Sequence, residues 1–190
     1  VARERARLWS VFFLVVTGRA QLDDDLSAEE YEQVFDFLYR TSFTAPFDIK
    51  TTEAQHYRRY VAQQRKKNGA SAQAPQGLIQ RQAGINDGKG FVFISHTGEI
   101  FPSGFLALSA VNIRHTTLQD AYRNSQLFQV LRDSDSLNGK CGACEYRNLC
   151  GGSRSRAFAL TGDYLESDPR CAYVPPAFTA QAPRPGLQPA

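Results

Sequence analysis

Four cysteines in the last third of the chain have side chains suited to binding a metal centre. They are the only cysteines among 190 residues and follow the spacing C-x2-C-x5-C-x20-C, at Cys141, Cys144, Cys150 and Cys171. A C-x2-C step lets two thiolates turn onto one centre, and the paired glycines at 151 and 152 let the backbone pass close to a bound group. The set therefore predicts a centre held by four sulfur atoms.

Three uses of these thiols compete. Two disulfides are possible from an even count, but we see no signal peptide, and a chain of this length can form a core without cross-links. Cys141 and Cys144 are also too close in sequence to be good structural disulfide partners. A structural zinc ion usually shows two C-x2-C knuckles, whereas this sequence has one. An iron–sulfur cluster accepts more irregular spacing because its corners lie farther apart than the ligands of one zinc ion, so spacing leaves zinc and cluster equally open.

The cysteine run and its flanks resemble the SPASM domain, the C-terminal auxiliary-cluster module of many radical S-adenosylmethionine (SAM) enzymes. The resemblance covers most of the chain. Within this family, the chain is similar to the SPASM proteins that are grouped with the haem and haem-d1 biosynthesis radical enzymes. It rests on three stretches: Cys141-x2-Cys144-x5-Cys150-Gly-Gly-Ser-Arg, the hairpin-like residues 91–105, and Asp168-Pro-x-Cys171-x-Tyr173. The cysteine run is the specific part.

Two positions depart from the family pattern. Ser103 stands where a G-x4-C step from Gly98 would end, and Arg154 stands where a C-x3-C step from Cys150 would end. The resemblance therefore implies ligands for one auxiliary cluster instead of two. We expect one [4Fe–4S] cluster, fully coordinated by Cys141, Cys144, Cys150 and Cys171. With no vacant iron, such a cluster suits electron transfer better than direct binding of a substrate.

The C-x3-C-x2-C loop at which radical SAM chemistry starts is absent from this sequence, which also contains no methionine. We therefore expect a C-terminal fragment of a longer enzyme, in which SAM binds only to the parent protein and the fragment alone does not cleave it. The expected partners are the missing N-terminal half of the barrel, an external electron donor such as ferredoxin or flavodoxin, and a substrate. A tetrapyrrole side chain is favoured over a peptide as that substrate. The alternative function is a non-catalytic zinc-binding structural or interaction module.

The composition is that of a globular protein, with 42% hydrophobic and 22% charged residues. The net charge of +3 is only mildly basic, and the basic residues occur in short groups, so we do not expect nucleic-acid binding. No apolar run approaches the length that spans a membrane. Reduced thiols favour the cytoplasm.

The first seventy residues alternate between strand and helix patterns. Residues 8–16 form a continuous β-branched and aromatic run, typical of a parallel strand buried on both faces, and residues 47–52 predict a second strand. A strand–helix–strand–helix order predicts an α/β fold with parallel strands and right-handed crossovers. Four elements are too few to close a barrel, so residues 1–70 are expected to be the C-terminal βα units of a partial TIM barrel.

Two helices follow these strands in the prediction. Ser27 and Glu30 form a capping box, after which Tyr31, Val34, Phe35 and Leu38 recur at helical spacing to about residue 40. The second helix is predicted over residues 53–67, with Thr52 and Gln55 as a weaker capping pair and with Tyr57, Tyr60 and Val61 facing inward.

The carboxyl ends of the strands are the working face in βα folds. This rule places Arg19 after the first strand, and Lys50 and Glu53 after the second, near a substrate or SAM. Arg19 or Lys50 could hold a carboxylate such as a porphyrin propionate, although a cap or loop charge ranks above this role for each of them. His96 lies beside a predicted turn and could be a ligand, but a turn histidine near solvent ranks above that role. His56 and His115 have no carboxylate or thiol at useful spacing, so no residue is assigned a catalytic role.

The remaining residues predict a linker at 71–88, a small α+β SPASM-type cysteine-rich domain at 89–176, and a disordered tail at 177–190. Within the domain we expect a hairpin turning at residues 97–98 and a helix capped by Thr117 that restarts at Ser125. Three arginines flank the cysteines and are expected to stabilise the thiolates and to raise the potential of a cluster: Arg147, Arg154 and Arg156.

Overall fold

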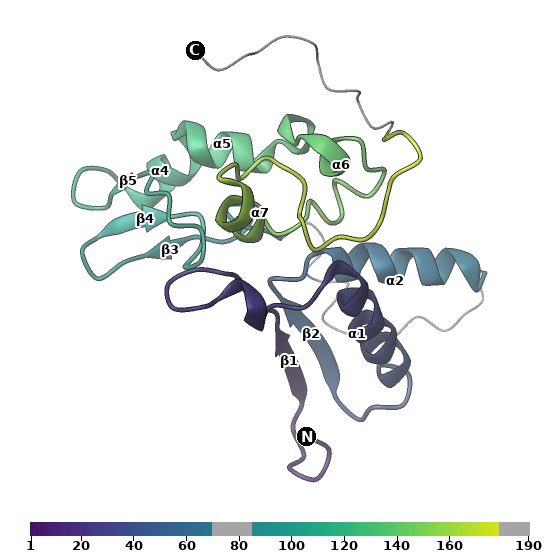
Figure 1. Cartoon of the computed structure of the whole chain (residues 1–190). Coiled ribbons are helices and arrows are strands. Elements are labelled where there is room, and N and C mark those ends of the chain that lie inside the picture. The colour runs from purple at the N-terminus through teal and green to yellow at the C-terminus, as the bar shows by residue number, and fades with distance from the viewer. Residues whose placement is uncertain (70–84, 179–190) are drawn as a thin grey trace.

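The computed structural model describes residues 1–69 and 85–178, which form an α/β region followed by a cysteine-rich region (Figure 1). The α/β region contains β1 (Leu8–Phe12), α1 (Ala28–Thr41), β2 (Asp48–Thr52) and α2 (His56–Lys67). The cysteine-rich region contains β3 (Phe93–Ile94), β4 (Glu99–Phe101), β5 (Val111–Asn112), α4 (Leu118–Asn124), α5 (Gln126–Arg132), α6 (Gly139–Gly142) and α7 (Arg154–Thr161). The mixed α/β character expected from the sequence is confirmed.

Strands β1 and β2 pair in parallel, in a register that runs from Leu8 opposite Asp48 to Phe12 opposite Thr52. Helices α1 and α2 lie beside these strands (Figure 1). Their shared core is aromatic, with Tyr31, Phe35 and Tyr57 fully buried against Ile49 and Phe13. The inward faces predicted for both helices are therefore confirmed.

The capping box predicted for α1 is present. The Ser27 hydroxyl accepts a hydrogen bond from the Glu30 amide at 3.2 Å, and the Glu30 carboxylate accepts one from the Ser27 amide at 2.8 Å. These two bonds satisfy donors that the first turn of a helix leaves without intrahelical partners.

Two details of the α/β prediction are wrong. The first strand ends at Phe12, and it is half-exposed because the helices pack only against the side of Trp9 and Val11, which leaves Leu8 and Phe12 facing outward. Helix α2 begins at His56 and has no side-chain cap, since Glu53 adopts a left-handed φ of 58° that interrupts helical geometry before Gln55.

The cysteine-rich region opens with the predicted hairpin. Strands β3 and β4 are antiparallel, and Gly98 in the turn has a φ of 90°, which a residue with a side chain rarely adopts. The third strand, β5, was not predicted. Thr117 caps α4 by accepting a hydrogen bond from the Asp120 amide, and Ser125 separates α4 from α5, as expected.

The expected linker and tail lie mostly at residues 70–84 and 179–190, outside the described residues. Asn86 and Asp87, which were assigned to the linker, are buried, so the folded cysteine-rich region already includes them. Across residues 1–69 and 85–178, no helix is both long enough and apolar enough to cross a membrane.

Candidate metal centre

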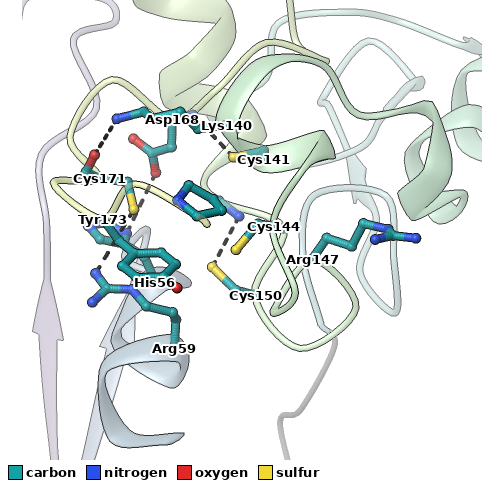
Figure 2. A pocket seen from close by; sticks show the side chains of 13 residues that line it. His56, Arg59, Lys140, Cys141, Cys144, Arg147, Cys150, Asp168, Cys171 and Tyr173 are labelled. Carbon is teal, nitrogen blue, oxygen red and sulfur yellow. Dashed lines mark hydrogen bonds and ion pairs between the residues drawn. The ribbon is translucent and has the colours of Figure 1, made fainter. Parts of the chain in front are cut away.

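All four cysteines line a single cavity, and all four are free thiols (Figure 2). Cys141 belongs to α6, Cys144 and Cys150 to the loop that follows it, and Cys171 to the C-terminal loop. The cavity is also lined by His56 and Arg59 from α2 and by Lys140, Asp168 and Tyr173. The structure therefore brings together the four residues predicted from their spacing.

The sulfur atoms do not form a compact site for one ion. In the described part of the chain, no three His, Cys, Asp or Glu side chains lie close enough together to hold a single metal ion. The four thiols instead line one cavity together with His56, Asp168 and Tyr173, which are drawn beside them in Figure 2.

Backbone amides donate hydrogen bonds to the sulfur atoms. The Asp168 amide lies 3.4 Å from Cys141 Sγ, and the Gly152 amide lies 3.3 Å from Cys150 Sγ. Burial raises the pKa of Cys144 and of Cys171. Backbone hydrogen bonds from Tyr146 to Cys144 and from Tyr173 to Cys171 favour the thiolates and offset part of this rise. Three of these donors sit two residues after the cysteine they serve. Amides aimed at sulfur stabilise thiolates, the form in which cysteine binds a metal.

Burial opposes ionisation in the absence of metal. It raises the pKa of Cys171 to about 11 and also raises the pKa of Cys144 and Cys150. These three thiols are therefore protonated near neutral pH in the absence of metal, and a bound metal would displace their protons.

Two guanidinium groups approach the sulfur atoms. Arg154 Nη2 lies 3.6 Å from Cys141 Sγ, and Arg59 Nη2 lies 4.0 Å from Cys171 Sγ. Arg59 is also paired with Glu32 and lies over the ring of Tyr173. Arg59 was not predicted to lie at the site, because 112 residues separate it from Cys171.

The other two arginines expected to flank the thiols point elsewhere. Arg147 forms an ion pair with Asp135 at 2.8 Å, and Arg156 pairs with Asp168 at 3.1 Å. Of the three arginines expected to flank the cysteines, only Arg154 donates to a sulfur atom within the described residues.

A buried polar network supports the C-terminal cysteine loop. Arg156 is fully buried and donates to Asp168, to the Leu14 carbonyl at 3.0 Å and to the Glu53 carbonyl. Burial alone would raise the pKa of Asp168, but the Arg156 guanidinium holds it at about 2. The network fastens the α/β region to the loop that carries Cys171.

His56 also lies in this network, although no carboxylate partner was predicted for it. Its Nδ1 lies 3.6 Å from Asp168 Oδ2, and burial lowers its pKa to about 3, so the imidazole is neutral. The partner is distant in sequence, so spacing along the chain could not indicate it.

A second cavity, a cleft of about 510 Å³, opens beside the loop that carries Cys144 and Cys150. Lys50 and Glu53 line it together with Arg58, Asp87 and several aromatic side chains, Phe91, Phe93 and Phe105. Arg19 is exposed and is not among the lining residues. Of the three residues predicted to lie near a substrate because they follow the strands, Lys50 and Glu53 therefore line one cavity and Arg19 does not.

Side chains that line the cleft donate hydrogen bonds to the loop that carries Cys150. Asn86 Nδ2 donates to the Gly152 carbonyl at 2.6 Å and lies 3.4 Å from the Cys150 carbonyl. Arg58 donates to the Leu149 carbonyl at 3.4 Å. A ligand that moved either side chain would therefore act directly on the loop that holds Cys150.

Glu53 is a buried carboxyl group that favours its protonated form. Burial and the neighbouring Asp87 carboxylate raise its pKa to about 7, although Ser153 Oγ donates to it at 2.7 Å and Arg156 lies nearby. Because the folded chain retains a proton that the unfolded chain releases above pH 4.5, this contribution to stability is complete below pH 4.5 and is lost as pH rises through about 7.

Replacing Glu53 by Gln should remove this pH dependence. Between pH 4.5 and 8, the free energy of unfolding of the wild type should fall relative to Glu53→Gln by on the order of 3 kcal/mol. Urea unfolding at several pH values measures this difference. Parallel pH profiles for the two proteins would show that Glu53 titrates normally in the folded chain.

No family model matches this chain. It is 41% identical over 168 residues to an AdoMet-dependent heme synthase of Methanosarcina barkeri, covering 88% of this chain and 48% of that protein. It is 40% identical over 174 residues to an AdoMet-dependent heme synthase of Nitratidesulfovibrio vulgaris, covering 90% of this chain and 47% of that protein. The chain spans about half the length of these relatives.

Shorter matches reach enzymes with other names. A pre-heme d1 synthase of Dinoroseobacter shibae is 31% identical, over 55% of this chain and 26% of that protein. A PqqA peptide cyclase of Granulibacter bethesdensis is 34% identical, over 45% of this chain and 24% of that protein.

Proposed function

Since this chain belongs to the radical SAM family, we propose that it is the auxiliary-cluster part of such an enzyme. Cys141, Cys144, Cys150 and Cys171 hold one [4Fe–4S] cluster, which transfers electrons while the parent enzyme modifies its substrate by radical chemistry. When bound, the cluster supplies a one-electron redox centre. The residues of this chain would hold it and adjust its potential.

The arrangement of the four thiols carries this proposal. In a tetrahedral zinc site, Zn–S distances of about 2.3 Å bring the sulfurs to within about 3.8 Å of one another. The four thiols instead line one cavity in which the described residues offer no three-residue site for a single ion. The four irons of a [4Fe–4S] cluster each take one thiolate at a separate corner, which matches four thiols that line one cavity.

The residues at the two departures from the family pattern support a single cluster. Ser103 is buried, its Oγ lies 3.1 Å from Ser155 Oγ, and it accepts hydrogen bonds from the Phe105 and Leu106 amides. Arg154 donates hydrogen bonds to the carbonyls of residues 164 and 166. Both positions are thus occupied by side chains with structural partners and supply no thiolate.

We further propose that residues 1–70 are the last βα units of a partial TIM barrel and that residues 89–176 are a SPASM-type domain. The parallel pairing of β1 and β2, with α1 and α2 packed against them, is the support for the first assignment. In this arrangement SAM and its cluster belong to the N-terminal half of the parent enzyme, and the cleft faces the substrate.

The cleft favours a tetrapyrrole over a peptide as the substrate class. Lys50 and Arg58 offer two cations for carboxylates, and Phe91 and Phe93 expose large parts of their rings beside them. Exposed aromatic faces next to paired cations suit a flat apolar ring system that carries carboxylates. The names of the heme synthase and pre-heme d1 synthase relatives agree with this class, and those of the peptide cyclases with the alternative.

Anaerobic reconstitution with iron and sulfide, followed by absorption and EPR spectroscopy and metal analysis, tests the proposal. We expect a brown protein with about four irons per chain that gains an EPR signal on reduction. A colourless protein that binds one zinc ion tightly, and excludes iron, would instead identify a structural zinc module.

Arg154 should raise the potential of the cluster. A unit charge roughly 6 Å away, at an effective dielectric constant of about 20, is worth about 3 kcal/mol. Arg154→Gln should therefore lower the midpoint potential by on the order of 100 mV in an anaerobic redox titration. Arg154→Lys loses the same backbone contacts but keeps the charge, so its shift should be less than half as large. Equal shifts in the two variants would show that packing, and not charge, controls the potential.

A further inference from the structure

A surface groove adjoins the cysteine cavity. It has a volume of about 580 Å³, and we call it the basic groove. Arg59 and Tyr173 line both the groove and the cavity, so one layer of side chains separates them. Its other lining residues include Glu32, Lys66, Lys67 and Tyr146.

The charge of the basic groove is unbalanced. Lys66 and Lys67, in the last turn of α2, are exposed. Glu32 is the acidic residue among the lining residues, and its carboxylate is taken up by Arg59. Because Arg59 and Glu32 are paired, the two exposed lysines leave the lining residues of the groove with a net positive charge.

The groove also offers a short route to the sulfur atoms. Ala172, which lines the groove, follows Cys171 directly, and Arg59 Nη2 lies 4.0 Å from Cys171 Sγ. The rings of Tyr146 and Tyr173 meet edge to face, with their centroids 5.9 Å apart. An electron that entered at this groove would cross one residue layer to reach the cluster.

We propose that the basic groove docks a small protein electron carrier with an acidic surface. This inference rests on the proposed cluster and names the partner of that site. One electron passes from the reduced carrier, which is oxidised, to the oxidised cluster, which is reduced, and no covalent bond changes. The positive charge of the basic groove favours a carrier with an acidic surface. Electron-transfer partners bury little surface when they associate, so their association depends on electrostatic steering.

Stopped-flow reduction of the reconstituted chain by reduced flavodoxin tests the docking. Lys66→Glu/Lys67→Glu should lower the second-order rate at least tenfold, and added salt should slow the wild type. The control is Arg3→Glu/Arg7→Glu, which changes the charge equally at exposed residues near the N-terminus (Figure 1) and should alter the rate less than twofold. All three proteins should be reduced equally by a small uncharged photoreductant.

The outcomes separate the two proposals. Equal flavodoxin rates in all three proteins, with the cluster present and reducible, would overturn the docking alone. A wild-type chain that binds no cluster would overturn the proposed function, and the docking with it.

Discussion

Replacing Arg156 by Met should lower the free energy of unfolding by about 3–5 kcal/mol, the largest effect on stability that we expect. The change leaves the Asp168 carboxylate buried without its cation. It also removes the N–H groups that donate hydrogen bonds to the Leu14 and Glu53 carbonyls. An uncompensated buried charge is costly because the interior solvates it poorly. For a chain of this size, the melting temperature should fall by roughly 10 °C or more. Urea unfolding of the purified chain measures the change.

Arg40→Met is the matched control. Arg40 forms an ion pair with Asp36 at 2.8 Å, but its side chain is 78% exposed, so the loss should be no more than about 0.5 kcal/mol. Adding Asp168→Asn to Arg156→Met should recover part of the lost stability, because it removes the buried charge. Equal losses for the two arginines would show that the buried network does not hold the loop.

Replacing Cys150 by Ala should abolish cluster binding, the largest effect on function that we expect. The Cys150 thiol lines the cysteine cavity, and the Gly152 amide already donates to it. Alanine supplies no ligand, so one corner of the cluster would be left without a thiolate. After anaerobic reconstitution, iron should fall from about four per chain to well below one, and the brown colour should be absent.

Arg147→Gln serves as the control for this variant. Arg147 also lines the cysteine cavity, but it pairs with Asp135 and donates nothing to a sulfur atom. It should retain the full iron content. Stable cluster binding by Cys150→Ala would remove Cys150 from the ligand set.

The features that the sequence predicted well depend on nearby residues. The capping bonds of Ser27 and Thr117 form within one helical turn, and the buried stripe of α1 recurs at a fixed period. The spacing of the four cysteines predicted that their thiols lie together, and the fold brings all four to one cavity.

The features that the sequence did not predict depend on contacts between distant segments. Arg59 reaches Cys171 and His56 reaches Asp168 only because α2 packs against the C-terminal loop. Arg156, which was expected to flank the cysteines and to stabilise their thiolates, forms an ion pair with the buried Asp168. The left-handed conformation of Glu53, which sets the start of α2, also has no signal in its local sequence, since glycine and asparagine favour this region and glutamate does not.

X-ray absorption spectroscopy at the iron edge of the anaerobically reconstituted chain tests the central claim most directly. If the four thiols hold one cluster, the spectrum should show a sulfur shell together with an iron–iron scattering shell, and Cys150→Ala should lack both. A chain that gives no iron signal and shows, at the zinc edge, a single shell of four sulfurs at about 2.3 Å would contradict the account.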